Sequence, residues 1–121
     1  MLKILSPLLG PDLLHLLAAM GHGDELAITD ANFPGASKAN RLVRLDGVSA
    51  TDILDAVLTL LPLDEFVEDR AVTMQVVGDP DQQVPIVAEF AEIVKKHEPG
   101  TRLTDIERFA FYDRAQEAFA I

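Results

Sequence analysis

Three histidines, His15, His22 and His97, are the side chains of this sequence best suited to moving protons near neutral pH. Histidine has an unperturbed pKa of about 6.5, so it can both donate and accept a proton in that range. His22 lies between Gly21 and Gly23, which free the backbone and leave the imidazole uncrowded. His22 is therefore a candidate catalytic residue, although Gly-His-Gly is also typical of a turn that ends a helix.

The other chemistries that these residue types allow have less support. His15 lies inside an apolar helical pattern, and His97 lies at the end of a later one, where the helix dipole favours a histidine without any function. His22 and Asp24 supply at most two metal ligands, and no second histidine stands at a zinc-binding spacing. We therefore expect no metal site. The serines lie in no Gly-x-Ser-x-Gly segment, and the chain has no cysteine nucleophile.

A second candidate group combines an arginine with aromatic rings near the end of the sequence. Arg108 and Tyr112 belong to the segment Glu-Arg-Phe-Ala-Phe-Tyr-Asp-Arg at positions 107–114. A guanidinium fork beside aromatic rings suits a sugar ring and its hydroxyl groups. The simpler interpretation is that Phe111 and Phe119 belong to the core and that Arg108 or Arg114 pairs with a carboxylate.

The apolar pattern predicts the elements that must position these groups. Helices are expected from Pro11 to Gly21, behind a Ser49 cap up to Pro62, over 84–97 and over 111–118. Strands are expected over 25–29, 42–45, 71–77 and 102–109. The alternation predicts a single α/β domain, a three-layer α/β/α sandwich with a mostly parallel or mixed central sheet.

Asp30 ends the strand expected over 25–29, and the carboxyl ends of strands in such sheets line the ligand crevice. His22 precedes the same strand and so belongs at its opposite end. Uniting His22 with Asp30 therefore requires the loop around His22 to fold back or a neighbouring subunit to contribute.

Composition narrows the class of protein. The 121 residues suit one domain, and 49% of them are hydrophobic, which is enough for a core. The formal net charge of −10 argues against binding of nucleic acids or anionic membranes. The absence of cysteine excludes disulfides, and no apolar run reaches the length of a membrane span, so a cytoplasmic protein is expected.

Longer motifs resemble one known family. They are Met20-Gly21-His22-Gly23-Asp24-Glu25, Asp30-Ala31 followed by Phe33-Pro34, Arg44 with Asp46-Gly47, and Arg108-Phe109-Ala110-Phe111-Tyr112 followed by Arg114-Ala115-Gln116, together with Met1-Leu2-Lys3, Ser6-Pro7-Leu8 and Ala118-Phe119-Ala120-Ile121. Over essentially its whole length, the chain resembles the L-fucose mutarotase and D-ribose pyranase family, and it is more similar to the fucose branch.

This resemblance implies a cofactor-independent isomerase that interconverts the α and β anomers of L-fucose or a related monosaccharide. It implies that His22 donates the proton and that Asp30 and Arg108 bind the sugar. Asp30 would hold hydroxyls or set the imidazole tautomer, and Tyr112 would help Arg108 to position the ring. Family members form homo-oligomers, pentameric rings paired into decamers, with sites between neighbouring subunits.

Two features depart from the family pattern. Members continue with a strand and a Tyr-Gly-Asn segment that closes the sugar site, so a chain ending at Ile121 is expected to lack that wall. Asn32 stands where the fucose branch often has histidine, which is expected to affect substrate preference. Two alternatives remain open: interconversion of the pyranose and furanose forms of D-ribose, and a catalytically silent sugar-binding protein.

Overall fold

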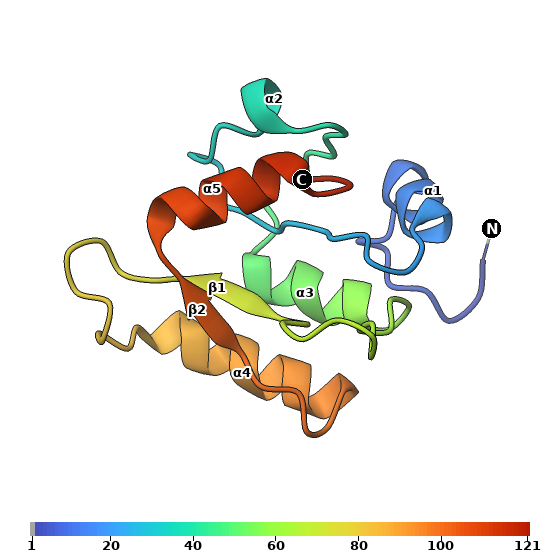
Figure 1. Ribbon diagram of the computed structural model, residues 1–121. Coiled ribbons are helices and arrows are strands. Elements are labelled where there is room, and N and C mark those ends of the chain that lie inside the picture. Colours follow the sequence, from blue (N-terminus) through green and yellow to red (C-terminus); the bar gives the residue numbers. More distant parts are fainter. Residues whose placement is uncertain (1) are drawn as a thin grey trace.

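The structure, a computed structural model, describes residues 2–121. Three helices come first, and two short strands then alternate with the last two helices, as Figure 1 shows from the N-terminus to the C-terminus. The elements are α1 (Pro11–Ala19), α2 (Gly35–Lys38), α3 (Ala50–Leu58), β1 (Val72–Met74), α4 (Pro85–His97), β2 (Thr104–Ile106) and α5 (Arg108–Glu117).

The two strands form a small parallel sheet. Val72 is in register with Thr104 and Met74 with Ile106, and α4 makes the crossover between β1 and β2. Figure 1 shows α4 on one side of the strand pair and α5 on the other. The prediction of a mixed α/β domain with parallel pairing is thus confirmed, while a full three-layer sandwich stays a prediction.

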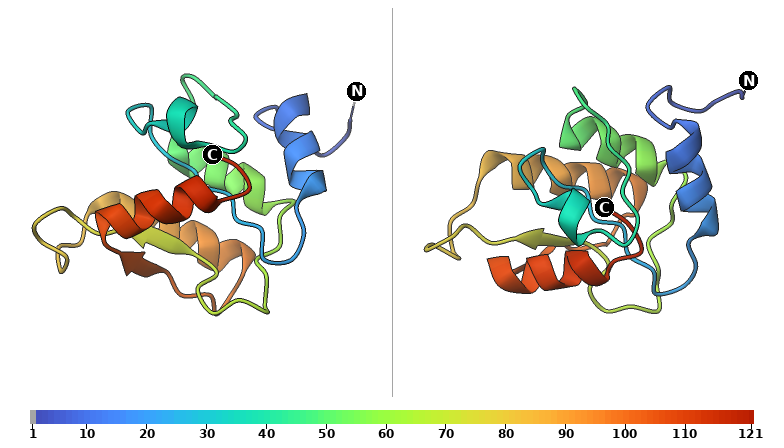
Figure 2. Two further views of the ribbon diagram at one scale, coloured as in Figure 1. Left: turned by 45° about the horizontal axis from the view of Figure 1, so that its top comes forward. Right: turned by 90° about the horizontal axis from the view of Figure 1, so that it is seen from above.

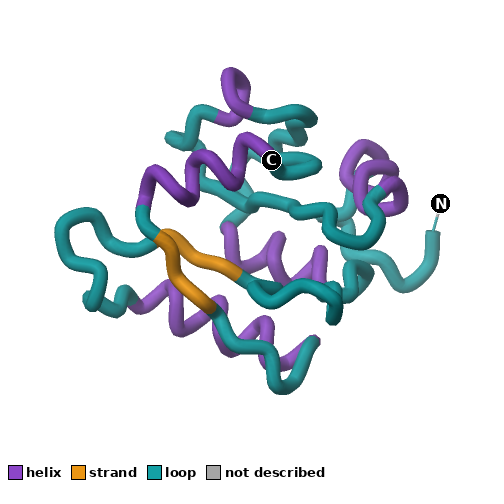
Figure 3. Tube along the Cα trace, in the orientation of Figure 1, coloured by secondary structure: helices purple, strands orange, loops and turns teal. Residues whose placement is uncertain are grey.

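The strands expected over 25–29 and 42–45 are wrong as regular strands, and Figure 3 shows both segments as loop. Each segment pairs only with residues 119–121. Ala27 N donates to Ala120 O at 3.0 Å, and Val43 N donates to Ile121 O at 3.0 Å. A ladder this short leaves one isolated parallel bridge, between Leu26 and Ala120. This pairing is too brief to make a strand.

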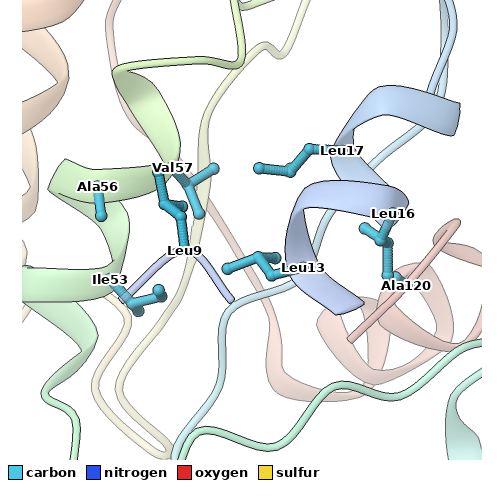
Figure 4. Packing of buried hydrophobic residues seen from close by; sticks show 8 residues of the cluster. All are labelled: Leu9, Leu13, Leu16, Leu17, Ile53, Ala56, Val57 and Ala120. Atoms are coloured by element: carbon cyan, nitrogen blue, oxygen red, sulfur yellow. The ribbon is translucent and has the colours of Figure 1, made fainter. Parts of the chain in front are cut away.

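The core joins the first helix to the third. Leucines from α1 meet the apolar face of α3, and Ala120 lies fully buried at the edge of the same cluster, as Figure 4 shows. The cluster consists of Leu9, Leu13, Leu16, Leu17, Ile53, Ala56, Val57 and Ala120. In both helices these residues recur at spacings of three and four, which place their side chains on one helix face.

Two helix ends show how local chemistry fixes the elements. The Ser49 hydroxyl accepts from Asp52 N at 3.2 Å, which confirms the predicted cap of α3.

His97 lies in the last turn of α4, as expected, and its Nε2 contacts Asp55 Oδ1 at 2.7 Å. Lys96 reaches the same oxygen at 2.9 Å. The contacts with Lys96 and then His97 lower the pKa of Asp55, with Lys96 as the largest cause, and they link α4 to α3.

Truncation of the core leucine Leu13 is expected to destabilise the protein. Leu13 is 4% exposed, so Leu13→Ala leaves a cavity as well as losing apolar burial. We expect a loss of about 2–5 kcal/mol in the free energy of unfolding, measured by urea titration. Leu2 is 72% exposed, and Leu2→Ala should change it by no more than about 0.5 kcal/mol. Equal effects of the two substitutions would contradict this description of the core.

Candidate functional site

The loop after α1 holds His22 out from the protein surface. Asp24 N donates to Gly21 O at 3.1 Å, and the Asp24 carboxylate accepts from Gly21 N at 2.8 Å, so residues 21–24 close a tight turn. Gly23 has a φ of 81°, a conformation that favours glycine over residues with a side chain. The His22 side chain is left 82% exposed and free to reach a ligand.

Two residues from a distant part of the chain contact the imidazole. Asp64 Oδ2 lies 3.3 Å from His22 Nδ1, and the Asp64 side chain is only 17% exposed. The ring of Phe66 meets the imidazole edge to face, with centroids 5.3 Å apart and an interplanar angle of 84°. Neither residue was predicted from the sequence. They stand more than forty positions from His22, in a segment with no local motif, so only the fold could bring them there.

Asp64 also organises the backbone around the histidine. Its Oδ1 accepts from Phe66 N at 2.9 Å, and its Oδ2 accepts from Gly23 N at 2.9 Å. These two bonds, Phe66 first and then Gly23, lower the pKa of Asp64, and the contact with His22 adds to them. Hydrogen bonds to the charged form favour that form, so Asp64 stays ionised at neutral pH.

The predicted sugar-binding residue Asp30 lies in a loop that packs on α5. Its Oδ1 accepts from Asn32 N and from Phe33 N, both at 3.0 Å, an Asx-type turn. Phe33 packs on Tyr112, with ring centroids 4.8 Å apart, and on Phe111, with centroids 6.2 Å apart. The turn therefore fixes the Asp30 carboxylate beside the helix that carries Tyr112. The carboxylate beside His22 is Asp64 and not Asp30.

Arg108 opens α5 rather than ending a strand, so the strand expected over 102–109 is too long by its last residues. The Glu107 carboxylate caps the helix by accepting from Phe109 N at 2.8 Å and Ala110 N at 3.2 Å. Arg108 and Tyr112 are four residues apart on this helix and so share a face. The Arg108 guanidinium lies 4.5 Å from the centroid of the exposed Phe109 ring.

Arg114 fixes α5 against the segment that runs from His22 to Asp30. Its Nε donates to Glu25 Oε2 at 2.9 Å and to Oε1 at 3.0 Å, while another guanidinium nitrogen lies 2.8 Å from Oε1. This pair raises the pKa of Arg114. The interpretation that Arg114 pairs with a carboxylate is thus confirmed, and its role is to hold the helix.

The structure divides the predicted site residues into two groups. Asp30, Arg108 and Tyr112 belong to one group, which we call the α5 cluster, and His22 belongs to the other, with Asp64 and Phe66, the His22 cluster. Extended backbone over 25–29 separates them, and at about 3.3 Å per residue this segment spans roughly 15 Å. Both views in Figure 2 show the loop after α1 and the start of α5 on opposite sides of the molecule.

One surface depression in the described residues belongs to neither cluster. A depression of about 500 Å³ lies between α4 and the segment entering β2, and its lining includes none of the predicted site residues. Residues 2–121 contain no group of three or more histidine, aspartate or glutamate side chains placed to hold a metal ion. No helix in that range is long and apolar enough to cross a membrane.

Comparisons with known proteins find one matching family and several similar solved structures. The model of the RbsD/FucU transport protein family matches residues 3–121. The crystal structure of the fucose mutarotase from Streptococcus pneumoniae in complex with L-fucose is 40% identical, with a TM-score of 0.89, and the match covers 99% of this chain and 86% of that one.

Two further solved structures agree with this result. FucU from Bifidobacterium longum is 38% identical, with a TM-score of 0.87, over 95% of this chain and 83% of that one. Protein Atu2016 is 40% identical, with a TM-score of 0.91, over 99% of this chain and 83% of that one. These matches extend over nearly the whole chain and include both clusters.

Proposed function

Because this chain belongs to the RbsD/FucU transport protein family, we propose that it is a sugar mutarotase that interconverts the α and β anomers of L-fucose or a related monosaccharide. The observation that carries the proposal is an exposed histidine, held by a carboxylate, on a chain 40% identical to a fucose mutarotase solved with its sugar. The activity is that of an isomerase, and it fits a cytoplasmic enzyme of monosaccharide metabolism.

The proposed chemistry is a proton transfer through His22. Nε2 takes the proton of the anomeric hydroxyl as the bond between the anomeric carbon and the ring oxygen breaks. The imidazolium then returns a proton to the ring oxygen, which gives the open-chain aldehyde. Rotation of the aldehyde and the reverse steps produce the other anomer. General acid–base catalysis of this kind typically contributes about 10²–10⁴-fold.

The α5 cluster would bind the sugar. The turn at Asp30 uses Oδ1, and Oδ2 has no hydrogen-bond partner within residues 2–121, so it is available for a sugar hydroxyl. Arg108 supplies forked donors one helical turn from Tyr112, and Phe33 offers an aromatic surface beside them. These are the groups that recognise a pyranose: hydrogen-bonding oxygens and nitrogens around an apolar face.

No hydrogen bond, ion pair or ring contact joins the two clusters within residues 2–121, so we propose that each site forms between neighbouring subunits. One subunit supplies the His22 cluster and the next supplies the α5 cluster. Such a head-to-tail contact closes into a ring when its rotation divides a full circle. A pentameric ring, alone or paired into a decamer, is the assembly that we expect. The three-layer α/β/α arrangement, with α4 and α5 flanking the sheet, belongs to the same proposal.

An exchange measurement tests this function directly. Saturating the α-anomeric proton of L-fucose and observing the β-anomeric signal by NMR reports their interconversion. The protein is expected to accelerate the exchange well above the rate in buffer, and more for L-fucose than for the ring forms of D-ribose. A larger acceleration with D-ribose would favour the pyranase alternative. Binding of L-fucose without any acceleration would contradict catalysis and identify a silent sugar-binding protein.

A further inference from the structure

We infer that Asp64 is a positioning residue: it holds the His22 imidazole with the proton on Nδ1, so that Nε2 is the nitrogen that exchanges protons with the substrate. The inference rests on the proposed function for its catalytic consequence. The tautomer itself is a property of the free protein.

The geometry assigns the proton because Asp64 can only accept. Its Oδ2 lies 3.3 Å from Nδ1, and an ionised carboxylate has no hydrogen to give. Neutral imidazole has one protonated nitrogen, so the nitrogen facing the carboxylate takes the proton and Nε2 keeps a free lone pair. The backbone bonds from Phe66 N and Gly23 N keep the carboxylate charged.

The Asp64 carboxylate is also less exposed and has more hydrogen bonds than the His22 ring that it faces. The Asp64 side chain is 17% exposed, while that of His22 is 82% exposed. Both carboxylate oxygens are bound to backbone N–H groups, one from the histidine loop and one from its own. Phe66, held by the second bond, meets the imidazole from another direction. The Asp64 carboxylate therefore contacts the imidazole itself and also positions Phe66, the second group that contacts the ring.

The other carboxylates of this region do not contact the imidazole. Asp24 Oδ2 accepts from Gly21 N, and Glu25 pairs with Arg114. Glu65, the next residue after Asp64, is exposed. Asp64 is thus the one acidic side chain that contacts the imidazole within residues 2–121. When His22 becomes an imidazolium in the reaction, its Nδ1–H can donate to the carboxylate, which stabilises the charge.

The tautomer of His22 is measurable without any sugar. Two-bond ¹⁵N–¹H NMR on the neutral histidine should show Nδ1 protonated in the wild-type protein. In Asp64→Ala the population is expected to shift toward the Nε2-protonated form. Glu65→Gln removes one negative charge from the same loop without touching His22, and Asp24→Asn alters the other carboxylate of the histidine turn. Both should keep the wild-type pattern. The same tautomer populations in wild type and Asp64→Ala would overturn the inference.

The catalytic consequence is tested on the same variants with L-fucose. We expect Asp64→Asn and Asp64→Ala to lower the maximal exchange rate by about 10- to 100-fold, within the range that general acid–base catalysis supplies, and to leave sugar affinity nearly unchanged. Asp64→Asn keeps the size of the side chain and serves if Asp64→Ala fails to fold. A shifted tautomer with an unchanged rate would overturn the positioning role. Failure of the wild-type protein to exchange any sugar would instead contradict the proposed function and leave the tautomer result standing.

Discussion

Replacing His22 by alanine is expected to return the exchange of L-fucose anomers to the rate in buffer. In the proposed mechanism the whole acceleration passes through this imidazole, so its removal should cost about 10²–10⁴-fold, or roughly 3–5 kcal/mol of barrier. Saturation-transfer NMR on the anomeric protons, with wild type and His22→Ala at equal concentration, measures the loss.

The same substitution should leave the fold unchanged, which makes the result interpretable. The His22 side chain is 82% exposed, so its removal opens no cavity. Asp64 keeps its bonds from Gly23 N and Phe66 N, and no buried group is left without a partner. The free energy of unfolding should therefore change by no more than about 0.5 kcal/mol.

His15 provides a matched control for the loss of an exposed histidine. It lies on the outer face of α1, and His15→Ala should keep the wild-type exchange rate. If His22→Ala exchanges fucose as fast as His15→Ala does, the proton transfer does not pass through His22 and the mechanism proposed for this site is wrong.

The helices α1, α3 and α4 could be predicted because their boundaries depend on nearby residues. Pro11 and Pro85 start α1 and α4, and Ser49 caps α3. The leucines of α1 recur at the spacing that a buried helix face requires, and they form the core as expected. These features need no knowledge of distant parts of the chain.

The predicted strands that are wrong or too long lie where distant pairing or an unusual helix cap decides the structure. An apolar run such as 25–29 predicts a strand, but a regular strand forms only where several residues pair with a neighbouring segment. Here only residues 119–121 pair with it. The strand expected over 102–109 includes Arg108, but the Glu107 carboxylate caps α5 and starts the helix there, although glutamate is not among the preferred capping residues. Asp64 reaches His22 only through the tertiary fold, so no spacing rule could have found it.

The separation of the two clusters gives the proposed oligomer a chemical role. His22 can move a proton, but the sequence between it and Asp30 is extended backbone tied to α5 by the Glu25–Arg114 pair. Folding this segment back would break that pair and the bonds to residues 119–121. A second subunit can supply the missing half of the site with no change in either protomer. Two exposed phenylalanines, Phe66 beside His22 and Phe109 beside Arg108, are available for burial in such a contact.

Mixed oligomers of two inactive variants are therefore expected to regain activity. His22→Ala damages the His22 cluster of every subunit, and Arg108→Ala damages the α5 cluster of every subunit. Both pure proteins should therefore lack accelerated exchange. Co-expressed with different affinity tags and purified through both, the subunits assemble at random. With head-to-tail contacts, about a quarter of the interfaces then combine an intact His22 cluster with an intact α5 cluster. The mixed oligomer should recover about that fraction of the wild-type rate.

The control is a mixture whose two defects lie in the same cluster. Asp30→Asn and Arg108→Ala both alter the α5 cluster, so every interface in their mixed oligomer carries one damaged half and no recovery is expected. Recovery in both mixtures would point to residual activity of the variants. Recovery in neither, with mixed oligomers confirmed by mass spectrometry, would mean that one subunit holds the whole site. Since the extended segment 25–29 keeps His22 and Asp30 apart in each protomer, recovery in the first mixture alone is the result that follows from this fold.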